Sequence, residues 1–190
     1  MPYDAAATRA RLIDAAVREF AAHGLAGARV DRIAALAASN KRAIYDYFGN
    51  KESLFDVALE RVIGELIEAV PLCAGNLPGY AGDLFDYLQE HPEAVRLLAW
   101  RRLERPHMGP RTTPEFLEQM TKVGDDIATE HEHTIGGVDL VVLTIGLANA
   151  WHLSARELLT SRGEDPTEAN RIAVHRAAVV EAVTRITRHT

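Results

Sequence analysis

The chain has 190 residues, of which 47% are hydrophobic and 25% are charged, and its formal net charge is −6. This composition is typical of a folded globular protein and argues against disorder, and no apolar run approaches the roughly 18 residues of a membrane span. The amino terminus lacks the pattern of a signal peptide. A single cysteine, Cys73, excludes an intrachain disulfide and a cysteine zinc cluster. We therefore expect a cytoplasmic protein without membrane association.

Helical periodicity runs through the whole chain, and no segment alternates apolar and polar residues as a strand would. The pattern predicts an all-α fold. In chain order, helices are expected from about Thr8 to Gly24, over Asp31–Ala37, Lys41–Tyr47 and Lys51–Val70, and then near Asp83–Glu90, Pro92–Glu104, Thr113–His131, Val138–Thr160 and Thr167–His189. The Gly- and Pro-rich stretch 71–82 is expected to be a loop.

Two short helices around a short turn, at residues 31–47, form a helix-turn-helix pattern. Ala34 is small enough for close packing, Ile44 closes a small core ten positions later, and Asn40 can cap the second of the two helices. Residues 1–52 hold 8 of the 21 Lys and Arg residues and 6 of the 27 Asp and Glu residues, so they carry +2 against −8 for the rest. A mildly basic head on an acidic body is compatible with DNA binding by the head.

The segment "RVDRIAALAASNKRAIYDYFGNKESLF" combines an Ile-Ala helix, a short turn, a Lys, and aromatic residues that end in Tyr-Phe before Lys-Glu. In this order it resembles the TetR family of transcriptional regulators. The resemblance implies a helix-turn-helix three-helix head at residues 1–52, followed by a larger helical ligand-binding and dimerisation bundle at 53–190. It also implies a double-stranded DNA operator, a small-molecule ligand and a second copy of the chain as partners. No cofactor and no metal are expected.

The resemblance assigns DNA contacts to the turn and to the second helix of the motif. Side chains that face the groove choose bases, whereas contacts to phosphates position the protein. Four residues depart from the family pattern: Ala38 stands where Gly is common, Ser39 where a small apolar residue is usual, Arg29 where a Thr often caps the helix, and Asp46 where many relatives have His. Asp46 would repel phosphate if it faced DNA. A left-handed backbone at Ala38 would cost roughly 1–2 kcal/mol. The expected DNA-binding residues are Arg29, Ser39, Asn40, Lys41, Arg42, Ala43, Tyr45, Tyr47 and Lys51.

In this family the middle helices surround a ligand pocket, and we expect the last two helices to form the dimer face. The pocket candidates combine large apolar side chains with a few polar groups, although each also fits an ordinary core. They are Trp100, Phe116, Met120, Val123, Ile127, Trp151 and His152. The dimerisation candidates recur at helical spacing and could instead complete the core of a monomer. They are Val141, Val142, Ile145, Ala148, Asn149, Ile172, Val179, Val180, Val183 and Ile186.

Rival functions have weaker support. The sequence contains no P-loop, no GxSxG and no HExxH motif, so no catalytic residue is assigned and an enzyme is not expected. His131 and His133 would point about 200° apart on a helix, which disfavours a shared metal ion. The favoured interpretation is a dimeric repressor that binds a palindromic operator and is released by a small molecule. The alternatives are a helical small-molecule-binding protein, or a His-based metal sensor, with weak or absent DNA recognition.

Overall fold

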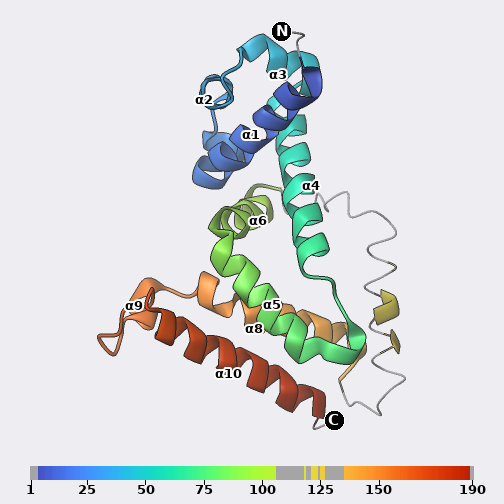
Figure 1. The fold of residues 1–190 in the computed structure, drawn as a ribbon, viewed down its shortest axis with the longest axis vertical. Helices are drawn as coiled ribbons and strands as arrows, with labels where there is room; N and C mark the ends of the chain where they lie inside the picture. Colours follow the sequence, from blue (N-terminus) through green and yellow to red (C-terminus); the bar gives the residue numbers. More distant parts are fainter. Residues whose placement is uncertain (1–3, 106–117, 119–120, 124, 127–134, 189–190) are drawn as a thin grey trace. The chain divides into compact units, whose positions relative to one another are not determined.

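A computed structural model of the chain describes residues 4–105, 118, 121–123, 125–126 and 135–188, and every regular element in these ranges is a helix (Figure 1). The prediction of an all-α fold is confirmed. Contacts between Cα atoms group the chain into two compact units, one with residues 1–66 and 91–111 and the other with 67–90 and 112–190. None of the described helices has the length and apolar character that a membrane crossing requires.

The first unit contains the helix-turn-helix. Its elements are α1 (Ala5–Gly27), α2 (Val30–Leu36), α3 (Lys41–Phe48), most of α4 (Lys51–Ala69) and α6 (Pro92–Glu104). Asp4 caps α1 by accepting a hydrogen bond from the Ala7 backbone N–H at 3.0 Å. Asn40 caps α3 in the same way, with 2.8 Å between its Oδ1 and the Ala43 nitrogen, as the sequence predicts.

The core of the first unit is built from the apolar faces of α1, α2, α3 and α4. The rings of Phe20 on α1 and Phe55 on α4 meet edge to face with 5.0 Å between their centroids. Both rings are fully buried, and burial of one such side chain contributes about 1.5–3 kcal/mol. Around them lie further side chains with no exposed surface: Leu12, Ala16, Ile33, Ile44, Leu54 and Ala58.

Helix α1 is kinked at Gly24, where φ is +68°. The sequence predicts that the helix stops there, but helical structure continues for three more residues, to Gly27. The close approach of α6 explains the glycine, because a Cβ at Gly24 would lie 2.8 Å from Cε3 of Trp100. Trp100 also donates its indole N–H to the Ala21 carbonyl, and Glu104 accepts from the Ala26 backbone N–H at 3.1 Å. Side chains of α6 therefore satisfy the backbone groups at the kink.

The second unit packs α5 (Leu77–Glu90), α8 (Gly137–Leu153) and α10 (Ala169–Arg188) against one another. A short 3-10 helix (Ala74–Asn76) precedes α5, and the four-residue α9 (Arg156–Leu159) follows α8. The Arg176 Nε lies 2.7–2.8 Å from both carboxylate oxygens of Asp86, which ties α10 to α5. The core of this unit comprises Leu77, Ala81, Val123, Leu140, Val141, Val179 and Val183.

Two predicted helix boundaries were wrong. Helix α5 begins at Leu77 rather than Asp83, because Asn76 caps it by accepting from the Gly79 N–H at 3.0 Å and Pro78 suits a first helical turn. Helix α8 ends at Leu153 rather than Thr160, and the separate helix α9 follows. Most of the helix predicted over 113–131 lies outside the described residues.

Ala38, in the turn between α2 and α3, has a φ of +48°, a left-handed value that favours glycine. We expect Ala38→Gly to raise the free energy of unfolding by about 1 kcal/mol, because it removes the strain of a Cβ while adding some entropy to the unfolded chain. Urea unfolding followed by circular dichroism measures this as a higher midpoint. The control Ala35→Gly changes an exposed residue inside α2 and should lower stability by about 1 kcal/mol. A lower midpoint for both variants would contradict the expectation.

Candidate nucleic-acid interface

Helix α3 has one buried side and one exposed side. Ala43, Ile44 and Phe48 point into the core of the first unit and are at most 8% exposed. The other side of the helix exposes Lys41, Arg42, Tyr45 and Asp46. A short helix with a polar, partly cationic exposed face, following a tight turn, has the form of a recognition helix that lies in the major groove of DNA.

Most of the residues expected to contact DNA are accessible, and one is not. Ala43 is 8% exposed and its backbone nitrogen is capped by Asn40, so it belongs to the core rather than to the groove face. Ser39, Tyr47 and Lys51 are half-buried. The remaining candidates, Arg29, Asn40, Lys41, Arg42 and Tyr45, are exposed.

Glu19 is an organising residue that the sequence analysis missed. Its side chain on α1 is 4% exposed, and it accepts a hydrogen bond from the Arg29 backbone N–H at 2.9 Å. Arg29 is the N-cap residue of α2 and makes no side-chain cap, and Glu19 accepts from its backbone N–H as the acid of a capping box does. Arg32 of α2 binds the same carboxylate through Nε at 2.7 Å and through a terminal nitrogen at 2.6 Å. The only sequence signal for this role is an acidic residue beside the buried Phe20.

The environment of Glu19 favours its ionised form. Burial acts to raise the pKa of the carboxyl group, but the hydrogen bond from Arg32 and the backbone N–H of Arg29 outweigh it, so the net pKa is lowered. The carboxylate is therefore charged at neutral pH and also complements the positive end of the α2 dipole.

Lys51, at the start of α4, is engaged within the protein. Its ammonium donates to the Ala28 carbonyl at 3.2 Å, which holds α4 to the connection between α1 and α2. Arg11 similarly donates from Nε to the Ala37 carbonyl at 3.4 Å, and Arg9 lies over the Phe48 ring at 5.4 Å. These three cations therefore make contacts within the protein that help to hold the helix-turn-helix together.

The two cations at the start of α3 face acidic partners. Lys41 lies 3.1 Å from the carboxylate of Asp31 on α2, and Arg42 lies 3.7 Å from that of Asp46 on α3. All four side chains are at least half exposed. Exposed ion pairs contribute about 0–1 kcal/mol, so either cation can exchange its partner for DNA at low cost.

The comparisons with known proteins agree with this geometry. A family profile described as "Bacterial regulatory proteins, tetR family" matches residues 12–58, and one described as "Tetracyclin repressor-like, C-terminal domain" matches residues 76–185. The chain belongs to the TetR family. It is 37% identical to the HTH-type transcriptional repressor SCO4008 of Streptomyces coelicolor over 92% of this chain and 95% of that protein.

Solved structures share the fold. The putative transcriptional regulator SCO4942 of Streptomyces coelicolor has a TM-score of 0.79 and 36% identity, covering 94% of this chain and 97% of that one. AibR, solved with isovaleryl coenzyme A and operator DNA, has a TM-score of 0.67 and 12% identity, with 93% and 97% covered. As a TetR-family member, the protein is a DNA-binding transcriptional regulator, and its relatives are regulators rather than enzymes.

The expected ligand residues that the structure describes divide between the two units. Trp100 belongs to the first unit and packs on α1, whereas Val123, Trp151 and His152 belong to the second. Val123 and Trp151 are at most 8% exposed, and Val123 packs in the core of the second unit. Three further candidates lie outside the described residues: Phe116, Met120 and Ile127.

His152 lies in an aromatic cluster that also contains a histidine missed by the sequence analysis. The rings of His152 and His175 lie 5.6 and 5.7 Å from Phe85, and His175 lies 4.6 Å from Trp151. Burial lowers the pKa of both imidazoles, and the buried Nε2 atom of each has no hydrogen-bond partner within the described part of the chain. Among the described residues no three His, Cys, Asp or Glu side chains group as metal ligands do, and His131 and His133 lie outside them.

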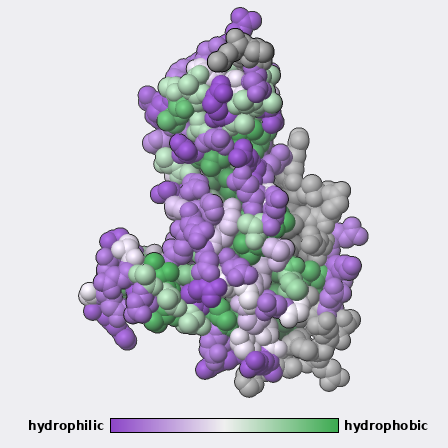
Figure 2. Space-filling view, viewed as in Figure 1, coloured by the Kyte–Doolittle hydropathy of each residue, from purple (hydrophilic) through white to green (hydrophobic). Residues whose placement is uncertain are grey.

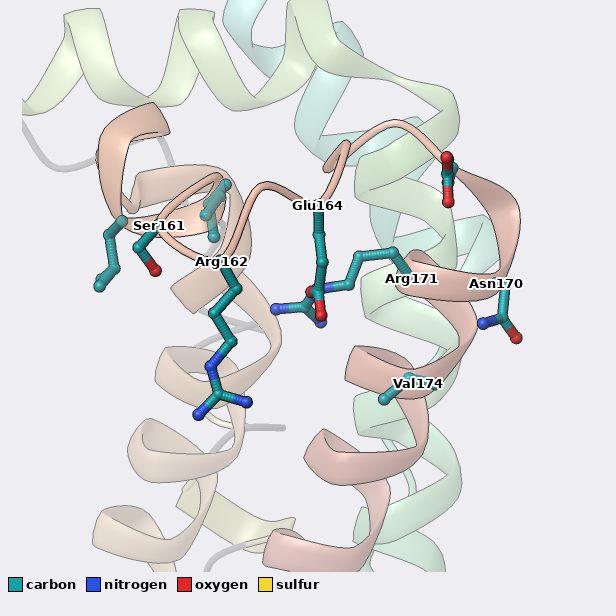
Figure 3. A pocket seen from close by; sticks show the side chains of 9 residues that line it. Ser161, Arg162, Glu164, Asn170, Arg171 and Val174 are labelled. Carbon is teal, nitrogen blue, oxygen red and sulfur yellow. The ribbon is translucent and has the colours of Figure 1, made fainter.

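A surface hollow of about 440 Å³ lies beside α9 and the start of α10 (Figure 3). Across it, Glu164 and Arg171 form an ion pair at 2.7 Å, and Arg171 also lies 4.7 Å above the Trp151 ring. Of the expected ligand residues, the four within the described ranges do not line this hollow. Its lining comprises Leu158, Leu159, Ser161, Arg162, Glu164, Glu168, Asn170, Arg171 and Val174.

The expected dimerisation residues divide into core and surface. Four of them, Val141, Ala148, Val179 and Val183, are at most 4% exposed within one protomer, so they form its own core. Val142 is 60% exposed. Half-buried positions are occupied by the others: Ile145, Asn149, Ile172, Val180 and Ile186.

We expect Glu19→Gln to lower the free energy of unfolding at pH 7 by about 1–3 kcal/mol, because the charged acceptor of Arg32 is lost. The folded-state pKa of Glu19 is lowered, so its stabilisation is present above the ordinary value of 4.5 and is lost as pH falls through the folded value. Urea unfolding at pH 7 and at several values below 4.5 measures the difference between wild type and variant, which should shrink in acid. The exposed, ion-paired Glu65→Gln serves as control and should change stability by less than about 1 kcal/mol. A difference that persists unchanged in acid would contradict this role.

Proposed function

We propose that the protein is a homodimeric transcriptional repressor that acts in the bacterial cytoplasm, binds a palindromic operator through α3 and is released by a small molecule. The observation that carries the proposal is the exposed face of α3, which presents Lys41, Arg42 and Tyr45 at the end capped by Asn40. The similarity to a protein named a transcriptional repressor, over nearly the full length of both chains, supports repression rather than activation.

Dimerisation is supported by apolar side chains that one protomer leaves uncovered. One helix-turn-helix meets few phosphates, and a symmetric dimer reads two half-sites about 34–36 Å apart. On α8, the exposed Val138, Val142 and Leu153 recur along one side of the helix at multiples of about one turn. Hydrophobic surface also lies in the region of α9 (Figure 2). The exposed large apolar residues of the second unit are Val138, Val142, Leu143, Leu153, Leu158 and Val174.

Release by a small molecule is supported by the interior of the second unit. Buried polar atoms in folded proteins almost always have partners, and the Nε2 atoms of His152 and His175 have none among the residues that the structure describes. A ligand that meets such atoms among Phe85 and Trp151 would bind one conformation better than another and would shift the DNA-binding population. AibR, which shares the fold, is a regulator solved with both an acyl coenzyme A and operator DNA.

Replacing both Lys41 and Arg42 by Ala tests DNA binding. Fluorescence anisotropy with DNA from upstream of the protein's own gene should show tight binding that weakens steeply with salt. The double variant should lose at least about 30-fold in affinity, since contacts of this kind are worth roughly 1–3 kcal/mol each.

The control for this double variant removes the same charge from α6, with Arg96→Ala and Arg102→Ala, which are exposed. It should bind like the wild type. If no upstream fragment binds, selection from random DNA replaces it as the source of operator sequence. Failure of that selection to enrich any sequence would contradict the proposal.

Val142→Glu tests the dimer. A carboxylate would be placed in the apolar interface of both copies, where burial without a partner costs several kcal/mol. Sedimentation velocity should show the wild type as a dimer and the variant as a folded monomer with weaker operator binding. The control Leu103→Glu changes an exposed leucine of α6, which is 73% exposed in the first unit, and should remain dimeric. A wild-type monomer, or a Val142→Glu dimer, would contradict the assigned interface.

A further inference from the structure

Arg42 and Asp46 lie at the centre of the exposed face of α3. Successive helical residues are about 100° apart, so the buried Ala43, Ile44 and Phe48 define the direction of the core. The positions opposite that direction are those of Arg42 and Asp46, one turn apart, and their side chains are 89% and 65% exposed. An α3 helix that enters a groove with this face therefore brings a carboxylate as well as a guanidinium against the DNA.

The carboxylate of Asp46 restricts what the helix can meet. DNA phosphates are anionic, and guanine N7 and O6 and thymine O4 are acceptors, so all of them oppose a carboxylate. The amino groups of cytosine N4 and adenine N6 are the hydrogen-bond donors on base edges in the major groove. An ionised Asp46 is therefore compatible with DNA where it meets one of these amino groups.

Arg42 fits the complementary base edge. An arginine can donate two hydrogen bonds to the O6 and N7 atoms of guanine. Its present partner is Asp46 at 3.7 Å, and an exposed pair one helical turn apart contributes only about 0.3–0.5 kcal/mol. Both side chains can therefore exchange their ion pair for hydrogen bonds to neighbouring bases at a small cost in free energy.

We propose that Arg42 and Asp46 act as a base-reading pair in each half-site of the operator. Arg42 binds a guanine, and Asp46 accepts a hydrogen bond from a base that carries an amino group in the major groove. This assignment rests on the proposed function, because it requires that α3 lie in the groove. It makes the departure of Asp46 from the family pattern a determinant of operator sequence.

The same carboxylate limits binding to DNA of other sequence. Arg32, Lys41 and Arg42 each face a carboxylate, from Glu19, Asp31 and Asp46 respectively. Non-specific affinity comes from cations that replace counterions at phosphates, and a neutralised surface gains little from this exchange. Asp46 therefore favours the operator in two ways. It accepts a hydrogen bond from one class of base, and it lowers the affinity for DNA of other sequence.

The test compares wild type with Asp46→Ala and Asp46→Asn in selection from random DNA, followed by anisotropy titration on single-base variants of the selected operator. In the wild type, one position in each half-site should require cytosine or adenine, and thymine or guanine there should weaken binding roughly 10- to 100-fold. Substituting cytosine and adenine in turn distinguishes the two sources of the amino group. Asp46→Ala should bind all four bases at this position with similar affinity.

Further variants distinguish base reading from a general effect of charge. Asp46→Asn should tighten binding to non-specific DNA and steepen its salt dependence, and the amide should tolerate thymine as well. Glu52→Gln removes the same charge from an exposed residue of α4, and it should leave the base preference unchanged. Arg42→Ala should relax the requirement for guanine at a neighbouring position.

The proposal is overturned if the Asp46 variants bind the operator with the wild-type preference at every position. In that case the proposed repressor function still stands. If the wild type itself enriches no sequence over random DNA, the pair reads nothing and the proposed function fails with it. Circular dichroism of each variant confirms that the helices are retained.

Discussion

In the first unit, the carboxylate of Glu19 lies between α1 and α2 and binds both the Arg29 backbone N–H and the Arg32 guanidinium. A seven-residue helix such as α2 has little stability of its own, because nucleating a helix is costly and few hydrogen bonds repay it. The buried carboxylate satisfies the backbone N–H of the N-cap residue and ties the start of α2 to α1. Since α3 packs on α2 across a connection of four residues, this carboxylate helps to set the position of the recognition helix.

Helix α6 belongs to the same unit for a comparable reason. The kink at Gly24 leaves backbone N–H groups near the end of α1 without helical partners, and Glu104 accepts from those of Leu25 and Ala26. Trp100 covers the glycine, where no other residue would fit beneath the indole ring. Helix α6 follows α5 directly in the chain, whereas its contacts are with α1. His91 therefore marks the point at which the chain returns to the first unit.

The features that could be predicted from the sequence are those set by local signals. The α3 helix and its Asn40 cap follow from residues within a few positions of each other, and the left-handed Ala38 follows from the resemblance to the family pattern; the structure has all three. Contacts between residues distant in the sequence leave no comparable signal. Nothing beside Glu19 in the sequence indicates that the fold brings Arg29 and Arg32 to its carboxylate. The dimer residues were ambiguous for another reason. Val141 and Val142 both fit an apolar helix face, and only packing against α5 and α10 decides that the first is core and the second surface.

The ion pairs of the helix-turn-helix affect which contacts an operator must provide. Lys41 and Arg42 are each paired to a carboxylate, so the exposed face of α3 offers a phosphate backbone less net positive charge than its cations alone would. In the proposed complex, sequence preference comes from matched hydrogen bonds to base edges, which a single short helix can make only in small number. A dimer makes twice as many hydrogen bonds to base edges, while its two copies lose translational freedom only once on binding. In the proposed dimer, the second copy supplies a second set of base contacts and covers the exposed apolar side chains of α8.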